Sequence, residues 1–250
     1  MSNATDQHYI TTRIIDACLR EDLRGIASRG SAATPDAALL AHWAAPQPPT
    51  QWWRITHLPD GTVWLPIHHG GYLQRISACS DRWLVQRGTA VQLEHGAAAW
   101  LQRLSQRLDP DTQQLHRAYA DEAACAAAHR GLARDAYATQ APHLAQALHA
   151  ADAAERAYRC DQLASYRDHP FYPTARAKAG LAPAELRAYA PEFAPTFALH
   201  WLAIPQAEVS CTSTPPAELW PDLARVGLPA ELAQTHQLWP VHPLVWARLE

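Results

Sequence analysis

The period of the apolar residues changes along the first third of the chain. Over residues 9–27 apolar side chains recur every three or four positions, which predicts an amphipathic helix ending near Gly25 or Gly30. Between residues 51 and 92 the pattern shifts to short β-type runs, two of them joined by an Asp60-Gly61 turn. These runs predict a small, mostly antiparallel sheet, and they cover residues 52–55, 63–67, 72–76, 83–85 and 91–93.

A helical block is predicted from residue 96 to residue 166. One helix covers 97–108 and stops at Asp109-Pro110, after which Asp111 is a candidate N-cap for a long helix. Further helix is expected after Pro142. The rest of the chain mixes both types, with helix at 183–189, strand at 196–204, a second strand at 208–213, two short helices from 215 and a last helical turn after His242-Pro243.

This order of elements predicts an α+β fold. An N-terminal helix and a small antiparallel sheet precede a long helical block, and a mixed α/β segment follows. We expect three regions: 1–95 as a helix-plus-sheet subdomain, 96–166 as the helical block, and 167–250 as the start of a ligand-binding region.

Composition narrows the possible functions. The formal net charge is −3, with 48% hydrophobic and 18% charged residues, so disorder and general nucleic-acid binding are both disfavoured. No apolar run approaches the length of a membrane span, and the polar N-terminus predicts no secretory signal. We therefore expect a cytoplasmic protein without a membrane partner, whose five scattered cysteines are reduced and mostly buried thiols.

Two other compositional features predict no site. The 14 histidines show no metal-ligand spacing such as His-Glu-x-x-His, so no metal ligands are predicted among them. The ten tryptophans are dispersed, which favours core packing around the small sheet over a cage for a ligand.

Residues 168–180 carry the candidate chemistry. Two prolines prevent regular helix at the start of this segment, so His169 and Tyr172 are expected to project from a stiff loop. Thr174, Arg176 and Lys178 follow, and Lys178 is the one lysine among 21 basic residues. Together these side chains offer several donors to an anionic, oxygen-rich ligand. The alternative is an ordinary surface loop whose single lysine is accidental.

The same segment resembles a known family. His-Pro-x-x-Pro-x-x-Arg-x-Lys-x-Gly at 169–180, followed by Tyr-Ala-Pro-Glu-Phe at 189–193, is similar to the signature of the IucA/IucC aerobactin synthetases. These siderophore synthetases work without a nonribosomal peptide synthetase. The chain departs from the family pattern in having Asp168 for Gly, Tyr172 for a second His, an inverted order of Arg176 and Lys178, and Leu-Val after His242-Pro243.

The resemblance implies an ATP-dependent ligase of siderophore biosynthesis and iron acquisition. Such enzymes use ATP and Mg²⁺ to adenylate a carboxylate of citrate or a related polycarboxylate, which then condenses with an amine or hydroxylamine. By resemblance, His169 and Lys178 would be catalytic, Tyr172, Thr174 and Arg176 would bind substrate or ATP, and Glu192 and His242 would support the site. A homodimer is expected by the same resemblance.

Length bears on whether this chain acts alone. Members of the family are more than twice as long, and their Ser-x-Arg-Thr nucleotide segment has no counterpart in these 250 residues. We therefore expect the N-terminal portion of a synthetase, inactive without a C-terminal continuation or a partner polypeptide. The alternative is a truncated, noncatalytic relative that acts as a binding, dimerisation or regulatory module.

Overall fold

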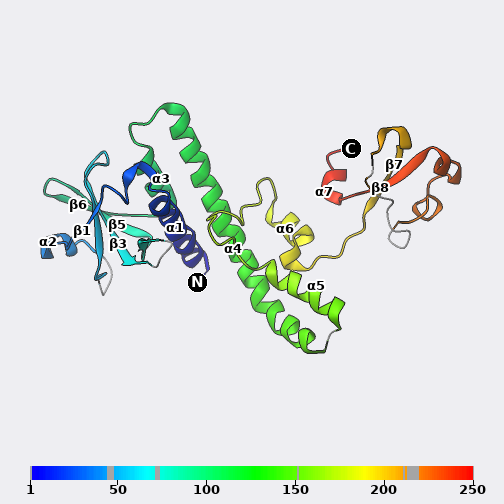
Figure 1. Ribbon diagram of the computed structural model, residues 1–250, viewed down its shortest axis with the longest axis horizontal. Helices are drawn as coiled ribbons and strands as arrows, with labels where there is room; N and C mark the ends of the chain where they lie inside the picture. Colours follow the sequence, from blue (N-terminus) through cyan, green and yellow to red (C-terminus); the bar gives the residue numbers. More distant parts are fainter. Residues whose placement is uncertain are drawn as a thin grey trace. The chain divides into compact units, whose positions relative to one another are not determined.

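The computed structural model describes residues 2–43, 48–70, 74–150, 152–210, 212 and 220–249. The chain forms two compact units, one of residues Met1–Leu186 and Pro191–Phe193, the other of Arg187–Ala190 and Ala194–Glu250. Helices and a small antiparallel sheet share the first unit, and a two-stranded sheet with short helices forms the second (Figure 1). The predicted α+β class is confirmed. The predicted boundaries after 95 and 166 both fall inside the first unit.

An antiparallel sheet forms one part of the first unit. Its strands run in the order β1-β2-β3-β5-β6, and β4 pairs with the end of β3. At the β2–β3 turn Gly61 has φ +109°, and a Cβ there would lie 2.6 Å from the carbonyl oxygen of Gln86, so the turn requires glycine. The strands are β1 Ser31–Ala32, β2 Trp52–Ile55, β3 Thr62–His69, β4 Ile76–Ala78, β5 Arg82–Arg87 and β6 Ala90–His95.

The two faces of this sheet bury different sets of side chains. Along β3, Val63, Leu65 and Ile67 join a large core with helices α1 (Ser2–Arg20) and α3 (Ala97–Ser105), whereas Trp64 packs on the opposite face. This alternation follows from the two-residue period of a strand. The predicted packing role of the tryptophans around the sheet is confirmed for those buried on or against it, which are Trp43, Trp52, Trp53, Trp64, Trp83 and Trp100.

Helices α1, α3 and α4 cover the larger core. The first five helices of the chain are α1 Ser2–Arg20, α2 Ala37–Leu40, α3 Ala97–Ser105, α4 Pro110–Ala150 and α5 Ala153–Ala164, with a 3₁₀ turn at Leu23–Gly25. The helices α1, α3 and α4 pack against one another, and small residues of α4 complete the core: Ala123, Ala126 and Ala127.

Several predicted helix bounds are wrong. Helix α1 ends at Arg20 because Asp22 and Arg24 adopt left-handed backbone conformations with φ 50° and 58°. The long helix α4 is capped by Asp109, not by Asp111: Asp109 accepts a 2.9 Å hydrogen bond from the Thr112 amide. Pro142 lies inside α4, which runs on to its last residue at 150.

The second unit is built around strands β7 His200–Pro205 and β8 His236–Val241, which pair antiparallel. Helix α6 Pro183–Tyr189 leads into it, as predicted, and α7 Pro243–Trp246 follows β8. Short 3₁₀ helices complete the chain: η2 Pro191–Phe193 in the first unit, and η3 Gln206–Glu208, η4 Ala224–Val226 and η5 Ala230–Gln234 in the second.

Other predicted elements differ from the structure or fall outside it. The strand predicted at 196–204 begins only at His200. A second strand was predicted to begin at Glu208, but this residue is the last of the 3₁₀ helix η3. Strand β8 was not predicted. Residues 71–73, 211 and 213–219, which include parts of three predicted elements, lie outside the described residues. Among the described residues, no helix is long and apolar enough to cross a membrane.

Four cysteines are described, and all are free. Cys18 is buried, Cys79 and Cys125 are partly buried, and Cys160 is exposed. The expectation that most of the thiols are buried is therefore wrong for the described ones, while Cys211 lies outside the described residues.

Candidate functional site

The motif loop, residues 168–180, lies against helix α4 in the first unit. Thr174 is only 1% exposed, and its hydroxyl donates to Oε1 of Glu122 on α4. The Tyr172 hydroxyl donates to the same carboxylate oxygen at 2.9 Å. About two helical turns beyond Glu122 on α4, the His129 Nδ1 atom lies 3.2 Å from the Lys178 amide nitrogen. The Glu122 carboxylate and the His129 ring, on one face of α4, therefore hold both halves of the loop, since His129 Nδ1 also lies 3.2 Å from the Arg176 carbonyl oxygen.

Helix α1 holds the beginning of the loop. The Arg13 guanidinium donates to the carbonyl oxygen of His169, and Arg20 donates to that of Phe171 at 3.4 Å. Arg20 also lies over the Phe171 ring, 5.1 Å from its centroid. Helices α1 and α4 therefore both hold this loop in place. Its exposed side chains project from a backbone of defined conformation.

His169 is exposed and shapes the turn. Its Nδ1 atom accepts hydrogen bonds from the amides of Phe171 at 3.2 Å and Tyr172 at 2.9 Å. A neutral imidazole that accepts at Nδ1 carries its proton on Nε2. His169 is thus oriented as a hydrogen-bond donor through Nε2.

Lys178 pairs with the acidic residue of the second motif. Its Nζ atom lies 2.5 Å from Oε1 of Glu192, whose side chain is 5% exposed against 32% for that of Lys178. The Tyr166 hydroxyl donates to the Glu192 carbonyl oxygen at 2.6 Å. Burial, and then the nearby Glu192 charge, raise the pKa of Tyr166, which keeps this hydroxyl a neutral donor. The structure thus brings together two motif residues that lie 14 positions apart.

Arg176 turns the other way, toward the end of α5. Its Nε atom donates to Oδ1 of Asp168, and its Nη1 atom donates to the Ser165 carbonyl oxygen at 3.1 Å. The side chain is 10% exposed, and its buried Nη2 atom has no hydrogen-bond partner among the described residues. The two cations of the motif therefore face different surroundings.

His242 belongs to the second unit. Its Nδ1 atom accepts from the Leu244 amide at 3.1 Å and so caps helix α7. The ring packs edge-on against Tyr189 and Phe197, with centroids 5.0 and 4.6 Å away. In this unit His242 organises the turn between β8 and α7.

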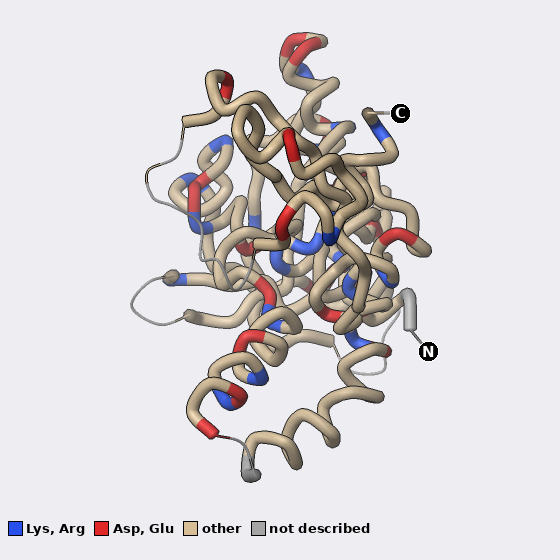
Figure 2. Tube along the Cα trace, turned by 90° about the vertical axis from the view of Figure 1, so that its right-hand side faces the viewer, with Lys and Arg blue, Asp and Glu red and all other residues tan. Residues whose placement is uncertain are grey.

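The sequence interpretation missed the α4 residues that anchor the loop. Glu122 and His129 are seven positions apart, a spacing that places both on one face of a helix. That spacing was available in the sequence, but nothing local to it indicated that the loop would pack there. Basic and acidic residues are interspersed along the chain (Figure 2).

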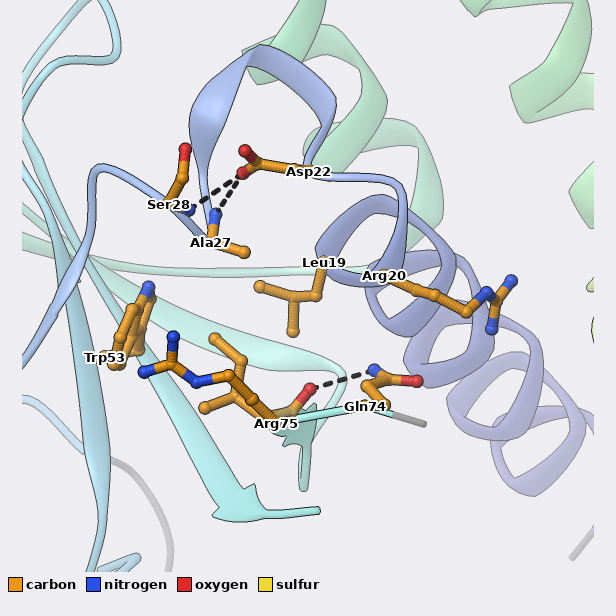
Figure 3. Close-up of a pocket in the computed structure, with 9 residues that line it drawn as sticks. Leu19, Arg20, Asp22, Ala27, Ser28, Trp53, Gln74 and Arg75 are labelled. Carbon is orange, nitrogen blue, oxygen red and sulfur yellow. Dashed lines mark hydrogen bonds between the residues drawn. The ribbon is translucent and has the colours of Figure 1, made fainter. Parts of the chain in front are cut away.

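A separate cavity of about 300 Å³ opens beside the sheet in the first unit. Figure 3 shows that Leu19, Trp53 and Arg75 face it from α1, β2 and the segment before β4. Its polar groups largely serve the fold, since Asp22 accepts from the amides of Ala27 and Ser28. None of its lining residues belongs to the motif loop.

One segment of the chain matches a known protein family. Residues 156–249 match the IucA / IucC family. This match covers the motif loop and the Tyr-Ala-Pro-Glu-Phe segment, so the resemblance stated from those residues is confirmed there. No curated protein matches the sequence.

Solved structures show where this fold occurs. An ATP-bound aerobactin synthetase IucA from a hypervirulent pathotype of Klebsiella pneumoniae is 15% identical, with a TM-score of 0.59 over 100% of this chain and 40% of that one. Aerobactin synthetase IucC from the same source is 18% identical, with a TM-score of 0.50 over 98% of this chain and 41% of that one. The chain has their fold and spans about two fifths of their length.

Proposed function

We propose that this chain, whose residues 156–249 match the IucA / IucC family, provides the N-terminal portion of an ATP-dependent synthetase of siderophore biosynthesis. The observation that carries the proposal is the motif loop, which the family match includes and which α1 and α4 hold in a defined conformation. A fixed loop that presents donors suits a reaction whose substrates are anions. The chain would act in the cytoplasm.

The proposed reaction has two steps. A carboxylate oxygen of citrate or a related polycarboxylate attacks the α-phosphorus of ATP, and pyrophosphate leaves. An amine or hydroxylamine nitrogen then attacks the acyl carbon, AMP leaves, and the nitrogen loses a proton. The first step brings two anions together, and in the second step negative charge develops on the acyl oxygen and on the leaving AMP. Positioned cations and N–H donors therefore accelerate both steps by orientation and by electrostatic stabilisation.

The motif residues take different parts in this proposal. His169 would donate through Nε2 to a carboxylate or phosphate oxygen, and Lys178 and Arg176 would offset anionic charge. Tyr172 is exposed and would contact substrate with its ring. Thr174 is buried against Glu122, so we assign it to positioning the loop.

Other components remain expectations from the family resemblance. Mg²⁺ is one of them, since no group of three or more His, Cys, Asp or Glu side chains could hold a metal ion within the described part of the chain. A homodimer and a C-terminal continuation or partner polypeptide are others.

One observation favours a second candidate function. Lys178 is paired with Glu192 and Arg176 with Asp168, so both motif cations are engaged within the chain. A noncatalytic relative that binds or regulates a complete synthetase would tolerate this arrangement. A synthetase would have to release or share these cations when its substrates bind.

Pyrophosphate release distinguishes the two functions. We expect no amine-dependent release from the chain alone with ATP and Mg²⁺, and release with citrate, succinate or 2-oxoglutarate once the downstream polypeptide is supplied. A Lys178→Ala variant should then lose most of this activity, whereas Arg117→Gln, at a distant position of α4, should not. Failure of every carboxylate in the combined protein would overturn the synthetase function.

A further inference from the structure

A cavity of about 360 Å³ lies in the first unit, lined in part by the motif loop. Helix α4, the segment after α5 and the motif loop itself contribute its polar lining. Six residues define this arginine pocket: Arg130, Arg134, Tyr137, Tyr166, Arg167 and Arg176. Of these, only Arg176 belongs to the family motif.

The charges in and around the arginine pocket do not cancel. Its lining contains four arginines and no acidic residue. Three aspartates pair with them from outside the lining: Asp6 with Arg130 and Arg134, Asp168 with Arg176 and Arg130, and Asp135 with Arg134. Among the described residues, the four arginines of the lining and the three aspartates paired with them carry an excess of one positive charge, which attracts an anion.

Unused donors point to the same conclusion. The Arg176 side chain is nine-tenths buried, and its Nη2 atom lacks a partner among the described residues. A buried guanidinium nitrogen without a partner is uncommon, because desolvation of a charged donor is costly. The Arg167 guanidinium lines the same cavity and is exposed, with no hydrogen bond or ion pair to the residues that the structure describes.

We propose that the arginine pocket binds a small polyanion through carboxylate or phosphate oxygens. Guanidinium groups match both oxygen geometries by paired N–H donors, and Tyr137 and Tyr166, in edge contact at 5.1 Å, form an aromatic wall beside them. The inference rests on the proposed function in so far as Arg176 belongs to the motif loop. It adds Arg130, Arg134 and Arg167 as anion-binding residues.

Titration calorimetry on the chain itself tests this pocket. Citrate and inorganic pyrophosphate are titrated separately at matched ionic strength into wild type, Arg167→Gln and Arg117→Gln. Arg167 is chosen because its exposed guanidinium makes no hydrogen bond or ion pair with the described residues. Arg117→Gln removes the same charge from α4 outside the pocket. We expect Arg167→Gln to weaken binding at least fivefold and Arg117→Gln to leave it unchanged.

Each outcome has a defined meaning. Binding of citrate alone supports a carboxylate site, binding of pyrophosphate alone a phosphate site, and binding of both a general polyanion site. The proposal is overturned when neither probe binds at millimolar concentration, or when the two variants bind equally well. If the combined protein releases pyrophosphate but Arg167→Gln binds the probes as wild type does, the synthetase function stands and the pocket is refuted. If probe binding depends on Arg167 but no pyrophosphate is released, the pocket stands and the synthetase function is refuted.

Discussion

The pairing of Lys178 with Glu192 permits a quantitative prediction. Replacing Lys178 by Ala leaves the Glu192 carboxylate, 5% exposed, without the cation at 2.5 Å. Breaking a fully buried ion pair costs about 3–5 kcal/mol. Because the Lys178 side chain is 32% exposed, solvent screens part of the interaction, and we expect a loss of about 1–2 kcal/mol.

A double-mutant cycle isolates this interaction. Urea unfolding followed by far-ultraviolet circular dichroism is measured for wild type, Lys178→Ala, Glu192→Gln and the double variant. The pair of Glu155 and Arg159, 2.7 Å apart on α5, has a carboxylate side chain that is 43% exposed. It serves as the control and should show a coupling of only about 0.3–0.5 kcal/mol. In thermal unfolding, a loss of 1–2 kcal/mol corresponds to a shift of about 2–8 °C for a protein of this size.

The cycle also tests whether the buried Glu192 carboxylate depends on Lys178. A coupling energy for Lys178 and Glu192 no larger than that of the control pair would refute the argument, since it would mean that Glu192 does not depend on Lys178. A coupling of about 1 kcal/mol or more would show that any ligand binding through Lys178, as proposed, has to compete with Glu192.

Two further predictions concern capping and thiol reactivity. Asp109→Ala should lower the thermal midpoint, whereas Asp111→Ala should not, because Asp109 caps α4. Hydrogen bonds from the Thr112 amide and hydroxyl lower the pKa of Asp109. The stabilisation by Asp109 is therefore complete above the pKa of this carboxyl in the unfolded chain and is lost as the pH falls through its lower pKa in the folded protein. Equal midpoints for the two variants would contradict the cap. Iodoacetamide at pH 8 should label exposed Cys160 before Cys18, since burial raises the pKa of Cys18 to about 11, and mass spectrometry showing equal rates would exclude this.

Local sequence pattern was sufficient for much of the first unit. The alternation of side chains around the Asp60-Gly61 turn identified the β2–β3 hairpin, because a strand directs successive residues to opposite faces. Helix α6 was predicted with its observed bounds. Strand β8 was missed because Pro240 lies within it, a residue that a strand accepts where its missing N–H is not needed for pairing.

Helix ends depended on contacts that spacing does not reveal. Apolar periodicity continued past Arg20, but the backbone leaves the helix at Asp22, whose carboxylate accepts from two later amides. Pro142 looked like a boundary, yet α4 accommodates it. A single lost hydrogen bond does not end a helix that neighbouring turns and packing maintain.

For the candidate site, the sequence by itself determined which residues are candidates for the chemistry: a stiff loop with His169, Arg176 and the single lysine, and a second motif with Glu192. Tertiary structure alone decided their partners. Packing of the loop on α4 directs Lys178 to Glu192 and Arg176 toward Asp168 and the arginine pocket. The reason is physical: residue type and short-range spacing determine local conformation, whereas the pairing of charges far apart in the chain depends on which helix faces meet in the core.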